Sequence, residues 1–174
     1  MPPPGPFKRD IFDRAHESRH TALLSGKDTP YWNERVISVP RKILGGVVDG
    51  MLSGSDSLSA STQEFLNVVC GGPLIIQGYG FTETVCSSTT QRLGDRDPNC
   101  VGQLLKTCKV GPKDIEEYKH TDTPEPRGEI CLRGPFLFKG YYKQPELTRE
   151  VLDADGWFHT GDVGSFTVDG KLRI

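Results

Sequence analysis

The sequence predicts an α/β fold, and three observations support this class. An expected strand, helix and second strand follow one another between residues 47 and 76. A glycine-rich polar stretch comes directly after the second strand, at the edge where open α/β sheets bind ligands. Beyond residue 100, short apolar segments alternate with glycine turns, and the chain ends in a hairpin pattern.

Length and composition restrict the class of protein further. The 174 residues usually correspond to one domain or to part of a larger one. With 35% hydrophobic and 25% charged residues the chain can bury a core, and a net charge of -2 argues against a dedicated nucleic-acid binder. The apolar runs are too short to span a membrane. Residues 1–7 are proline-rich, do not form a secretory signal and are predicted to be a flexible lead-in.

The cysteines predict free thiols in a reducing compartment. They are odd in number and show no Cys-x-x-Cys pair, so a disulfide framework or a metal site fits these spacings poorly. The five positions are Cys70, Cys86, Cys100, Cys108 and Cys131.

The first half of the chain predicts two helices, a strand, a third helix and a second strand. Apolar residues recur at helical spacing over residues 9–24, and a second short helix over 31–44 is expected to be interrupted by Pro40. A strand is expected near residues 47–52. The third helix starts after Ser59 or Ser61, with Glu64 completing a capping box, and ends at the glycine pair 71–72.

The second strand is expected at 73–76. In the second half, strands are expected at 104–110 and 129–133, on either side of a polar loop at 113–127. A short helix over 145–152 begins at a proline, which suits a first helical turn. Asp169-Gly170 forms the turn of the final hairpin.

The octet Gln-Gly-Tyr-Gly-Phe-Thr-Glu-Thr at 77–84 carries the first candidate site. Glycines on both sides of Tyr79 let a ligand approach the backbone, and the aromatic ring can stack on a flat heterocycle. Thr82 can donate to a phosphate oxygen, and Glu83 can bind Mg²⁺. A purine nucleotide with its metal would use all of these groups. The alternative is a strand-end turn with an ordinary N-cap threonine. The octet matches neither a dinucleotide fingerprint nor a phosphate loop.

A second polar group stands at 160–162, where Thr-Gly-Asp precedes the hairpin. The Asp162 carboxylate could accept hydrogen bonds from the two hydroxyls of a ribose. The alternative interpretation is an Asx-type turn that leads into the hairpin. The two polar groups support each other, because one nucleotide would use both.

These patterns together resemble the adenylate-forming enzymes, and within them the long-chain fatty acyl-CoA synthetases. The resemblance covers residues 8–174 and rests on four blocks in the family's order. The blocks are Leu-Ser-Gly-Ser at 52–55, the octet at 77–84, the stretch from Gly-Glu-Ile at 128–130 to Gly-Tyr-Tyr at 140–142, and Trp-Phe-His-Thr-Gly-Asp at 157–162. This chain departs from the family at 54–58, where it reads Gly-Ser-Asp-Ser-Leu and lacks a usual proline.

The resemblance implies a two-step activation of a long-chain fatty acid. ATP and the acid give an acyl-adenylate, and coenzyme A then takes the acyl group, with Mg²⁺ required. It implies that Tyr79 stacks on adenine, Thr82 touches the phosphates, Glu83 binds Mg²⁺ and Asp162 holds the ribose. Thr82 and Glu83 would thus be the catalytic pair. The remaining implied cofactor-binding residues are Gly54, Ser55, Gln77, Gly78 and Gly80.

The resemblance also implies the later part of the large N-terminal domain of such an enzyme. Residues 40–100 would continue an α/β layered portion, and residues 101–174 would contribute to a distorted β-barrel. The family's phosphate loop would lie before residue 1, and its hinge and small C-terminal domain would follow residue 174. The isolated chain is therefore expected to be an inactive piece. Expected partners are fatty acid, ATP and coenzyme A, without nucleic acid.

Two other functions remain open at this point: a non-catalytic remnant that binds a nucleotide or a partner, and a synthetase for aryl or short-chain acids. An intracellular location is expected, either the cytoplasm or the cytosolic face of the endoplasmic reticulum or peroxisome. Peripheral membrane association could come from regions outside this chain.

Overall fold

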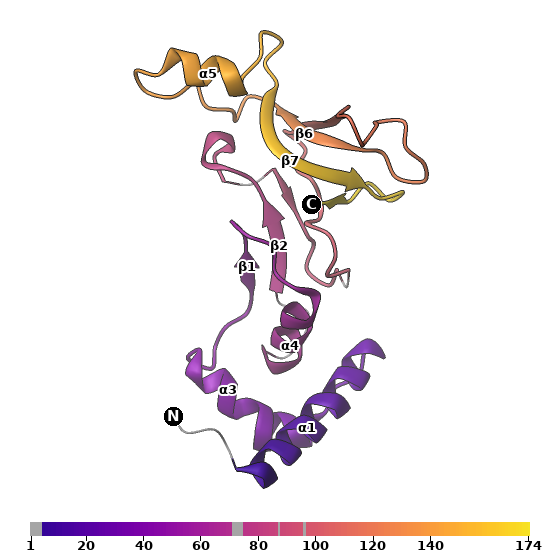
Figure 1. The fold of residues 1–174 in the computed structure, drawn as a ribbon. Helices are drawn as coiled ribbons and strands as arrows, with labels where there is room; N and C mark the ends of the chain where they lie inside the picture. Colours follow the sequence, from indigo (N-terminus) through magenta and orange to yellow (C-terminus); the bar gives the residue numbers. More distant parts are fainter. Residues whose placement is uncertain (1–4, 71–74, 87, 96) are drawn as a thin grey trace. The chain divides into compact units, whose positions relative to one another are not determined.

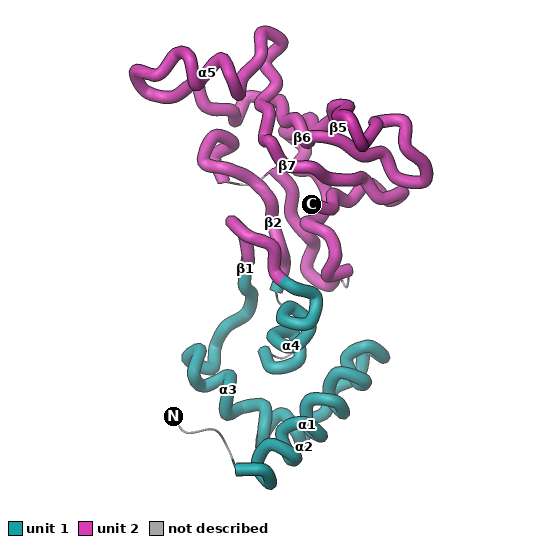
Figure 2. The backbone as a smooth tube through the Cα atoms, viewed as in Figure 1, with its two compact units in different colours: residues 1–51, 59–75 teal, residues 52–58, 76–174 magenta. Residues whose placement is uncertain are grey.

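The computed structural model describes residues 5–70, 75–86, 88–95 and 97–174. The chain forms two compact units, one of residues 1–51 with 59–75 and one of residues 52–58 with 76–174 (Figure 2). Most of the predicted lead-in, the glycine pair predicted to end the third helix and the first half of the strand predicted at 73–76 lie outside the described residues.

The helices of the first unit are α1 (Pro6–Leu24), α2 (Pro30–Trp32), α3 (Ser38–Ile43) and α4 (Ala60–Cys70). The helix predicted at 9–24 is confirmed, although it begins earlier, at a proline that suits its first turn. Pro40 does not interrupt the second helical region as predicted. A π-helical turn, η1 (Asn33–Ile37), joins α2 to α3 and lies just before this proline, so the helical path continues to Ile43.

A buried arginine connects α1 to α4 inside the first unit. The Arg19 residue is 2% exposed, and its Nε atom donates to the Val68 carbonyl at 2.9 Å. Its Nη1 atom donates to the Asp28 carboxylate at 2.8 Å, so the buried charge has a partner. Ala15 and Ile37 are fully buried in the same unit.

The start of α4 confirms the first of the two predicted caps, Ser59, in place of the capping box at Ser61 and Glu64. Ser59 is the cap, because its Oγ atom accepts a hydrogen bond from the Thr62 backbone nitrogen at 3.2 Å. Later in the helix the buried Gln63 donates from Nε2 to the Ile75 carbonyl at 3.0 Å. This bond joins α4 to the strand that leads into the octet.

In the part of the chain that the structure describes, the strands form two four-stranded sheets (Figure 1). The first has the order β1-β2-β3-β4, in which β3 pairs antiparallel with both β2 and β4. Its strands are β1 (Met51–Ser53), β2 (Ile75–Tyr79), β3 (Thr89–Thr90) and β4 (Gln103–Leu104). The second is an antiparallel sheet with the order β5-β6-β7-β8, and its long strands curl like half a barrel.

Most elements in and around the second sheet agree with those that the sequence predicts. Its strands are β5 (Lys109–Lys113), β6 (Arg127–Arg133), β7 (Phe158–Phe166) and β8 (Leu172–Arg173). The predicted strand 129–133 and the final hairpin are confirmed, as is the short helix, α5 (Pro145–Val151). The single strand predicted at 104–110 is wrong. A turn, in which the Cys108 nitrogen donates to the Leu105 carbonyl, separates β4 from β5.

The hydrophobic core of the second unit lies on one face of this sheet. Its fully packed members are Ile130, Leu132, Phe158 and Leu172. Tyr79 and Phe81 from the octet pack against this core, so the octet is anchored by burial of its aromatic side chains.

The five cysteines are free, as the sequence predicts. Cys70, Cys100 and Cys131 are buried. Burial raises the pKa of Cys131 to about 11, with a further contribution from the Glu129 charge, so this side chain is a neutral thiol at physiological pH.

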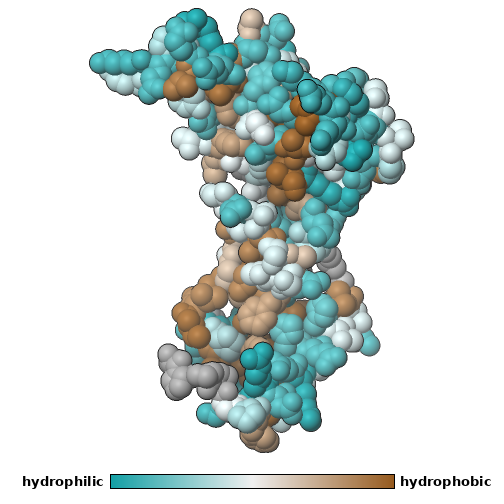
Figure 3. All heavy atoms as spheres, viewed as in Figure 1, coloured by the Kyte–Doolittle hydropathy of each residue, from teal (hydrophilic) through white to brown (hydrophobic). Residues whose placement is uncertain are grey.

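Apolar surface is also present outside the core. Figure 3 shows hydrophobic atoms gathered over α3 in the first unit, where Val39, Ile43, Leu44 and Val47 are exposed. Among the described helices, none combines the length and apolar character needed to cross a membrane.

Gly102 gives a stability prediction with a matched control. Gly102 and Gly94 both have left-handed φ values, of 89° and 88°. A Cβ atom on Gly102 would lie 2.0 Å from the Thr90 carbonyl carbon, whereas one on Gly94 would meet nothing within 4 Å. We expect Gly94→Ala to cost about 1–2 kcal/mol of unfolding free energy, and Gly102→Ala distinctly more because β3 must move. Urea unfolding of both variants measures the difference, and equal losses would contradict the steric argument.

Candidate functional site

The octet begins as strand and ends as a tight turn. The strand β2 extends to Tyr79, three residues beyond the predicted end of the strand at 76, and the turn η2 (Thr82–Thr84) follows. The buried Thr84 hydroxyl accepts from the Phe81 nitrogen at 2.9 Å and donates to the Phe81 carbonyl at 3.0 Å. The threonine that fixes this turn is therefore Thr84, and Thr82 is left exposed.

Gln77 holds two neighbouring loops beside the octet. It is 5% exposed, its Oε1 atom accepts from the Leu58 nitrogen at 3.2 Å, and its Nε2 atom donates to the Pro98 carbonyl at 3.0 Å. A Cβ atom on Gly54 would lie 3.4 Å from the Gly78 carbonyl oxygen. The loop at 53–58 thus runs close along the strand that carries the octet.

Tyr79 and Asp162 meet directly, although 83 positions separate them. The Tyr79 hydroxyl donates to Oδ2 of Asp162 at 2.9 Å. Burial raises the pKa of Tyr79, and the Asp162 charge adds to this effect, so the phenol keeps its proton. The Asp162 nitrogen donates to the Thr160 hydroxyl at 3.1 Å, and that hydroxyl donates to the Ile130 carbonyl.

The Asx-type turn offered as the alternative for 160–162 forms in its threonine version, because the Thr160 hydroxyl accepts from the nitrogen of Asp162, two residues on. These residues lie inside β7, and the described hydrogen bond to the Asp162 carboxylate comes from Tyr79. The carboxylate is thereby directed toward the octet.

Glu83 is held by a residue that sequence reasoning did not single out. Its Oε1 atom accepts from the Tyr141 hydroxyl at 2.8 Å, and this hydrogen bond raises the pKa of Tyr141. The Glu83 carbonyl accepts from the Phe138 nitrogen at 2.8 Å. The segment around residues 138–141 therefore fixes both the backbone and the side chain of Glu83.

Two adjoining pockets of about 420 and 730 Å³ collect the predicted residues within the second unit. Both volumes lie in the range typical of small-molecule sites. The first pocket is lined by Ser55, Gln77, Gly78, Tyr79, Gly80 and Asp162, together with Phe81, Val101 and Ile174. The second is lined by Gly54, Ser55, Gly78, Gly80, Thr82 and Glu83. Every residue predicted for the site lines at least one of them.

The two pockets differ in chemistry. The first combines the ring of Tyr79 with the carboxylate of Asp162, a set that suits a heterocycle bearing hydroxyl groups. The second combines the exposed hydroxyl of Thr82 with the carboxylate of Glu83. Hard oxygen donors of this kind fit Mg²⁺ together with phosphate oxygens. The arrangement suits a nucleotide that extends from one pocket into the next.

The sequence did not indicate several residues around these pockets. Phe81 stands edge-on between Tyr79 and Phe158, with ring centroids 5.3 and 5.6 Å away. Val101 and Ile174 line the first pocket from distant parts of the chain. Tyr141 belongs to a family block, but nothing in its local pattern indicates a contact with Glu83.

Comparison with known proteins identifies the family to which this fold and these pockets belong. A profile described as "AMP-binding enzyme" matches residues 15–142, and the chain belongs to this family. It is 42% identical to long chain acyl-CoA synthetase 7, peroxisomal, of Arabidopsis thaliana, over 98% of this chain and 25% of that protein. It is 34% identical to long-chain-fatty-acid–CoA ligase 6 of Homo sapiens, over 97% of this chain and 24% of that protein. The chain spans about a quarter of the length of these relatives.

Solved structures agree with the family. The adenylation domain of carboxylic acid reductase from Segniliparus rugosus, solved with AMP and a carboxylic acid, superposes with a TM-score of 0.67 at 28% identity. The match covers 95% of this chain and 25% of that one. MatB from Rhodopseudomonas palustris gives a TM-score of 0.65 at 32% identity, over 84% of this chain and 29% of that one. The chain is a mixed α/β segment that corresponds to part of an adenylation domain.

Proposed function

We propose that this chain belongs to an ATP-dependent long-chain fatty acid–CoA ligase. The fatty acid carboxylate attacks the α-phosphorus of ATP, which gives acyl-adenylate and releases pyrophosphate. The thiol of coenzyme A then attacks the acyl carbon and displaces AMP. The observation that carries the proposal is the convergence of Tyr79, Glu83 and Asp162 on adjoining pockets, in a chain 42% identical to a long-chain acyl-CoA synthetase.

The proposed roles follow the chemistry of the two pockets. Tyr79 stacks on adenine, and Asp162 accepts hydrogen bonds from the ribose hydroxyls. Thr82 donates to the phosphates, and Glu83 holds Mg²⁺, which when bound neutralises charge that develops on the phosphoryl oxygens. The other residues proposed to border the base and sugar are Gly54, Ser55, Gln77, Gly78 and Gly80.

We further propose that the chain is the later part of the large N-terminal domain of its parent enzyme. Residues 40–100 would then continue a layered α/β portion, and residues 101–174 would contribute to a distorted β-barrel. The fatty acid and coenzyme A would also contact regions outside this chain. The names of two plant relatives suggest the peroxisome as the first compartment to examine.

Pyrophosphate exchange with a panel of acids tests the proposal in the full-length enzyme. We expect ATP–pyrophosphate exchange to depend on long-chain fatty acids and to be weak with aryl or short-chain acids. If exchange is strongest with an aryl or short-chain acid, the proposed substrate class is wrong and that acid class takes its place. Absence of exchange with every acid, in a folded protein that binds ATP, would favour a non-catalytic nucleotide-binding protein.

A further inference from the structure

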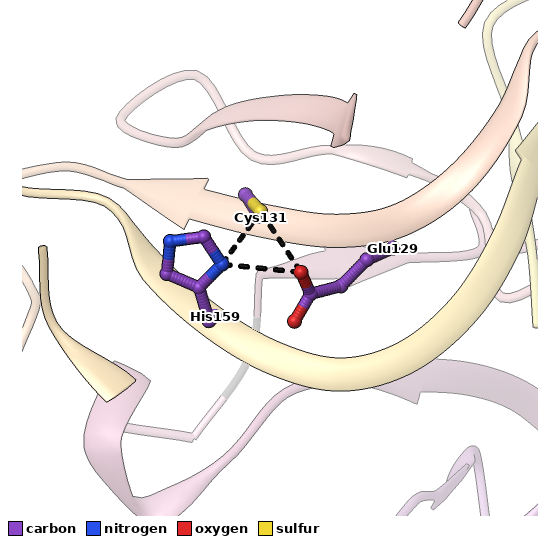
Figure 4. A group of neighbouring side chains, drawn as sticks. All are labelled: Glu129, Cys131 and His159. Atoms are coloured by element: carbon purple, nitrogen blue, oxygen red, sulfur yellow. Dashed lines mark hydrogen bonds and ion pairs between the residues drawn. The ribbon is translucent and has the colours of Figure 1, made fainter. Parts of the chain in front are cut away.

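Three side chains from neighbouring strands converge on the second sheet, and none of them is among the residues proposed for nucleotide binding. Glu129 and Cys131 belong to β6, and His159 of β7 pairs directly with Cys131 in the ladder. The ladder shifts register between Glu129 and Cys131. Figure 4 shows the three side chains pointing toward one another.

The three polar atoms already stand close to the spacing of metal ligands. Nδ1 of His159 lies 3.1 Å from Oε2 of Glu129 and 3.5 Å from Sγ of Cys131, and the sulfur lies 4.0 Å from Oε2. Tetrahedral zinc has bonds of about 2.0–2.3 Å, which separate neighbouring ligand atoms by roughly 3.3–3.6 Å. Small side-chain adjustments would therefore bring all three atoms into contact with one ion.

Two of the three candidate ligands also form a hydrogen bond through their second polar atom. Nε2 of His159 lies 3.3 Å from Oδ2 of Asp153, whose other oxygen accepts from the Trp157 nitrogen at 2.8 Å. Oε1 of Glu129 accepts from the Gly161 nitrogen at 3.2 Å. A carboxylate that orients the second nitrogen of a histidine ligand is a recurrent feature of zinc sites, where it fixes the ring and its tautomer.

We propose that Glu129, Cys131 and His159 form a binding site for a zinc-like divalent ion. Sulfur and imidazole ligands favour Zn²⁺ over Mg²⁺, which prefers oxygen ligands, so this site differs in kind from the one proposed at Glu83. A pocket of about 290 Å³ opens onto Cys131 and His159, which leaves room for a water molecule as fourth ligand.

The charges at the site balance when the ion is bound. One thiolate and one carboxylate neutralise a divalent ion, and the thiol proton is released to solvent as the ion binds. Lys113 and Asp153 also line the pocket, and their opposite charges offset each other. The ligands are largely shielded from water, since the side chains of Glu129 and His159 are each 18% exposed and Cys131 is 6% exposed.

Titration with Co²⁺ tests the proposal on the purified full-length protein after its metals are removed. We expect one Co²⁺ per chain, with a sulfur-to-cobalt charge-transfer band and the intense visible bands of a tetrahedral ion, both lost when Zn²⁺ is added. Cys131→Ser should abolish the charge-transfer band. Cys108→Ser is the matched control, because Cys108 is a partly buried thiol just before β5 and should leave the band unchanged.

Asp153→Asn provides a second test that keeps all three ligands in place. It should retain the charge-transfer band and weaken metal affinity by about tenfold or more, because the histidine loses its orienting carboxylate. A wild-type protein that shows no charge-transfer band would overturn the proposal and leave a hydrogen-bonded cluster. A band that persists in Cys131→Ser would overturn it equally. Circular dichroism of each variant checks that the fold is retained.

Discussion

Glu83→Gln in the full-length enzyme is expected to lower the rate of adenylation by on the order of 10²-fold or more. The amide keeps the shape of the side chain and can still accept from the Tyr141 hydroxyl, so the change removes mainly the negative charge. That charge is the proposed ligand for Mg²⁺ beside the phosphates. The measurement is ATP–pyrophosphate exchange across a range of Mg²⁺ concentrations.

Tyr141→Phe is the matched control for this prediction. It removes the hydroxyl that donates to Glu83 at 2.8 Å but leaves the carboxylate in place. We expect it to lower exchange much less than Glu83→Gln does. Unchanged exchange by Glu83→Gln at every Mg²⁺ concentration would exclude the metal-binding role. Equal losses in the two variants would indicate that the position of the carboxylate, which the Tyr141 hydroxyl holds, matters as much as its charge.

Asp162→Ala is expected to weaken ATP binding by tenfold or more. The substitution removes both acceptors for a ribose diol, and each hydrogen bond to a charged group contributes about 1.5–3 kcal/mol. Binding of 2′,3′-dideoxy-ATP should change much less, because this nucleotide has no diol to lose. Equilibrium dialysis or calorimetry with both nucleotides gives the comparison. Equal losses of affinity for the two nucleotides would show that Asp162 does not bind the ribose hydroxyls.

Tyr79→Phe separates ribose recognition from the support of Asp162. The hydroxyl of Tyr79 donates to Asp162 at 2.9 Å, and phenylalanine removes that donor while it keeps a ring for stacking. We expect Tyr79→Phe to weaken ATP binding less than Asp162→Ala does, and to weaken the binding of both nucleotides to a similar extent. The contrary outcome is that Tyr79→Phe reduces the affinity for ATP more than that for 2′,3′-dideoxy-ATP, by as much as Asp162→Ala does. That result would mean that the tyrosine, and not the aspartate alone, recognises the diol.

Local patterns predicted those parts of the fold that local forces determine. The helical periodicity of residues 9–24 and the turn at Asp169-Gly170 produced α1 and the final hairpin. The failures have long-range or context-dependent causes. Pro40 was expected to break a helix, but a π-helical turn precedes it and the helical path continues. The burial of Arg19 could not be predicted, because its partner carbonyl on Val68 lies 49 positions away.

The candidate site was predictable as a set of residues but not as an arrangement. Glycines around Tyr79, the adjacent Thr82 and Glu83, and Asp162 in the Thr-Gly-Asp group already suggested a nucleotide, and the family resemblance added Gly54 and Ser55. No local pattern could show that Tyr79 donates to Asp162 or that Tyr141 supports Glu83, since 83 and 58 positions separate these pairs. The roles of these residues remain predictions until the variants are measured.

The Glu129, Cys131 and His159 cluster escaped sequence reasoning for a related reason. Metal sites are recognised in sequences by short spacings such as Cys-x-x-Cys, whereas here the histidine lies 28 positions beyond the cysteine. The two residues become neighbours only because β6 and β7 pair with Cys131 opposite His159. Strand register, which a spacing count does not contain, brings them together.

The strand β7 has a consequence for the way this sequence can change during evolution. Successive residues of a strand point to opposite faces, and Phe158 and Asp162 lie on the face that holds the core and Tyr79, while His159 lies on the other. A substitution affects one face at a time. The pairing with β6 is already irregular between His159 and Val163, and a deletion or insertion of a single residue there would either change this irregularity or exchange the faces of the residues beyond it. The length of this segment is therefore constrained more strictly than its composition, and length variation belongs in the polar loop between β5 and β6.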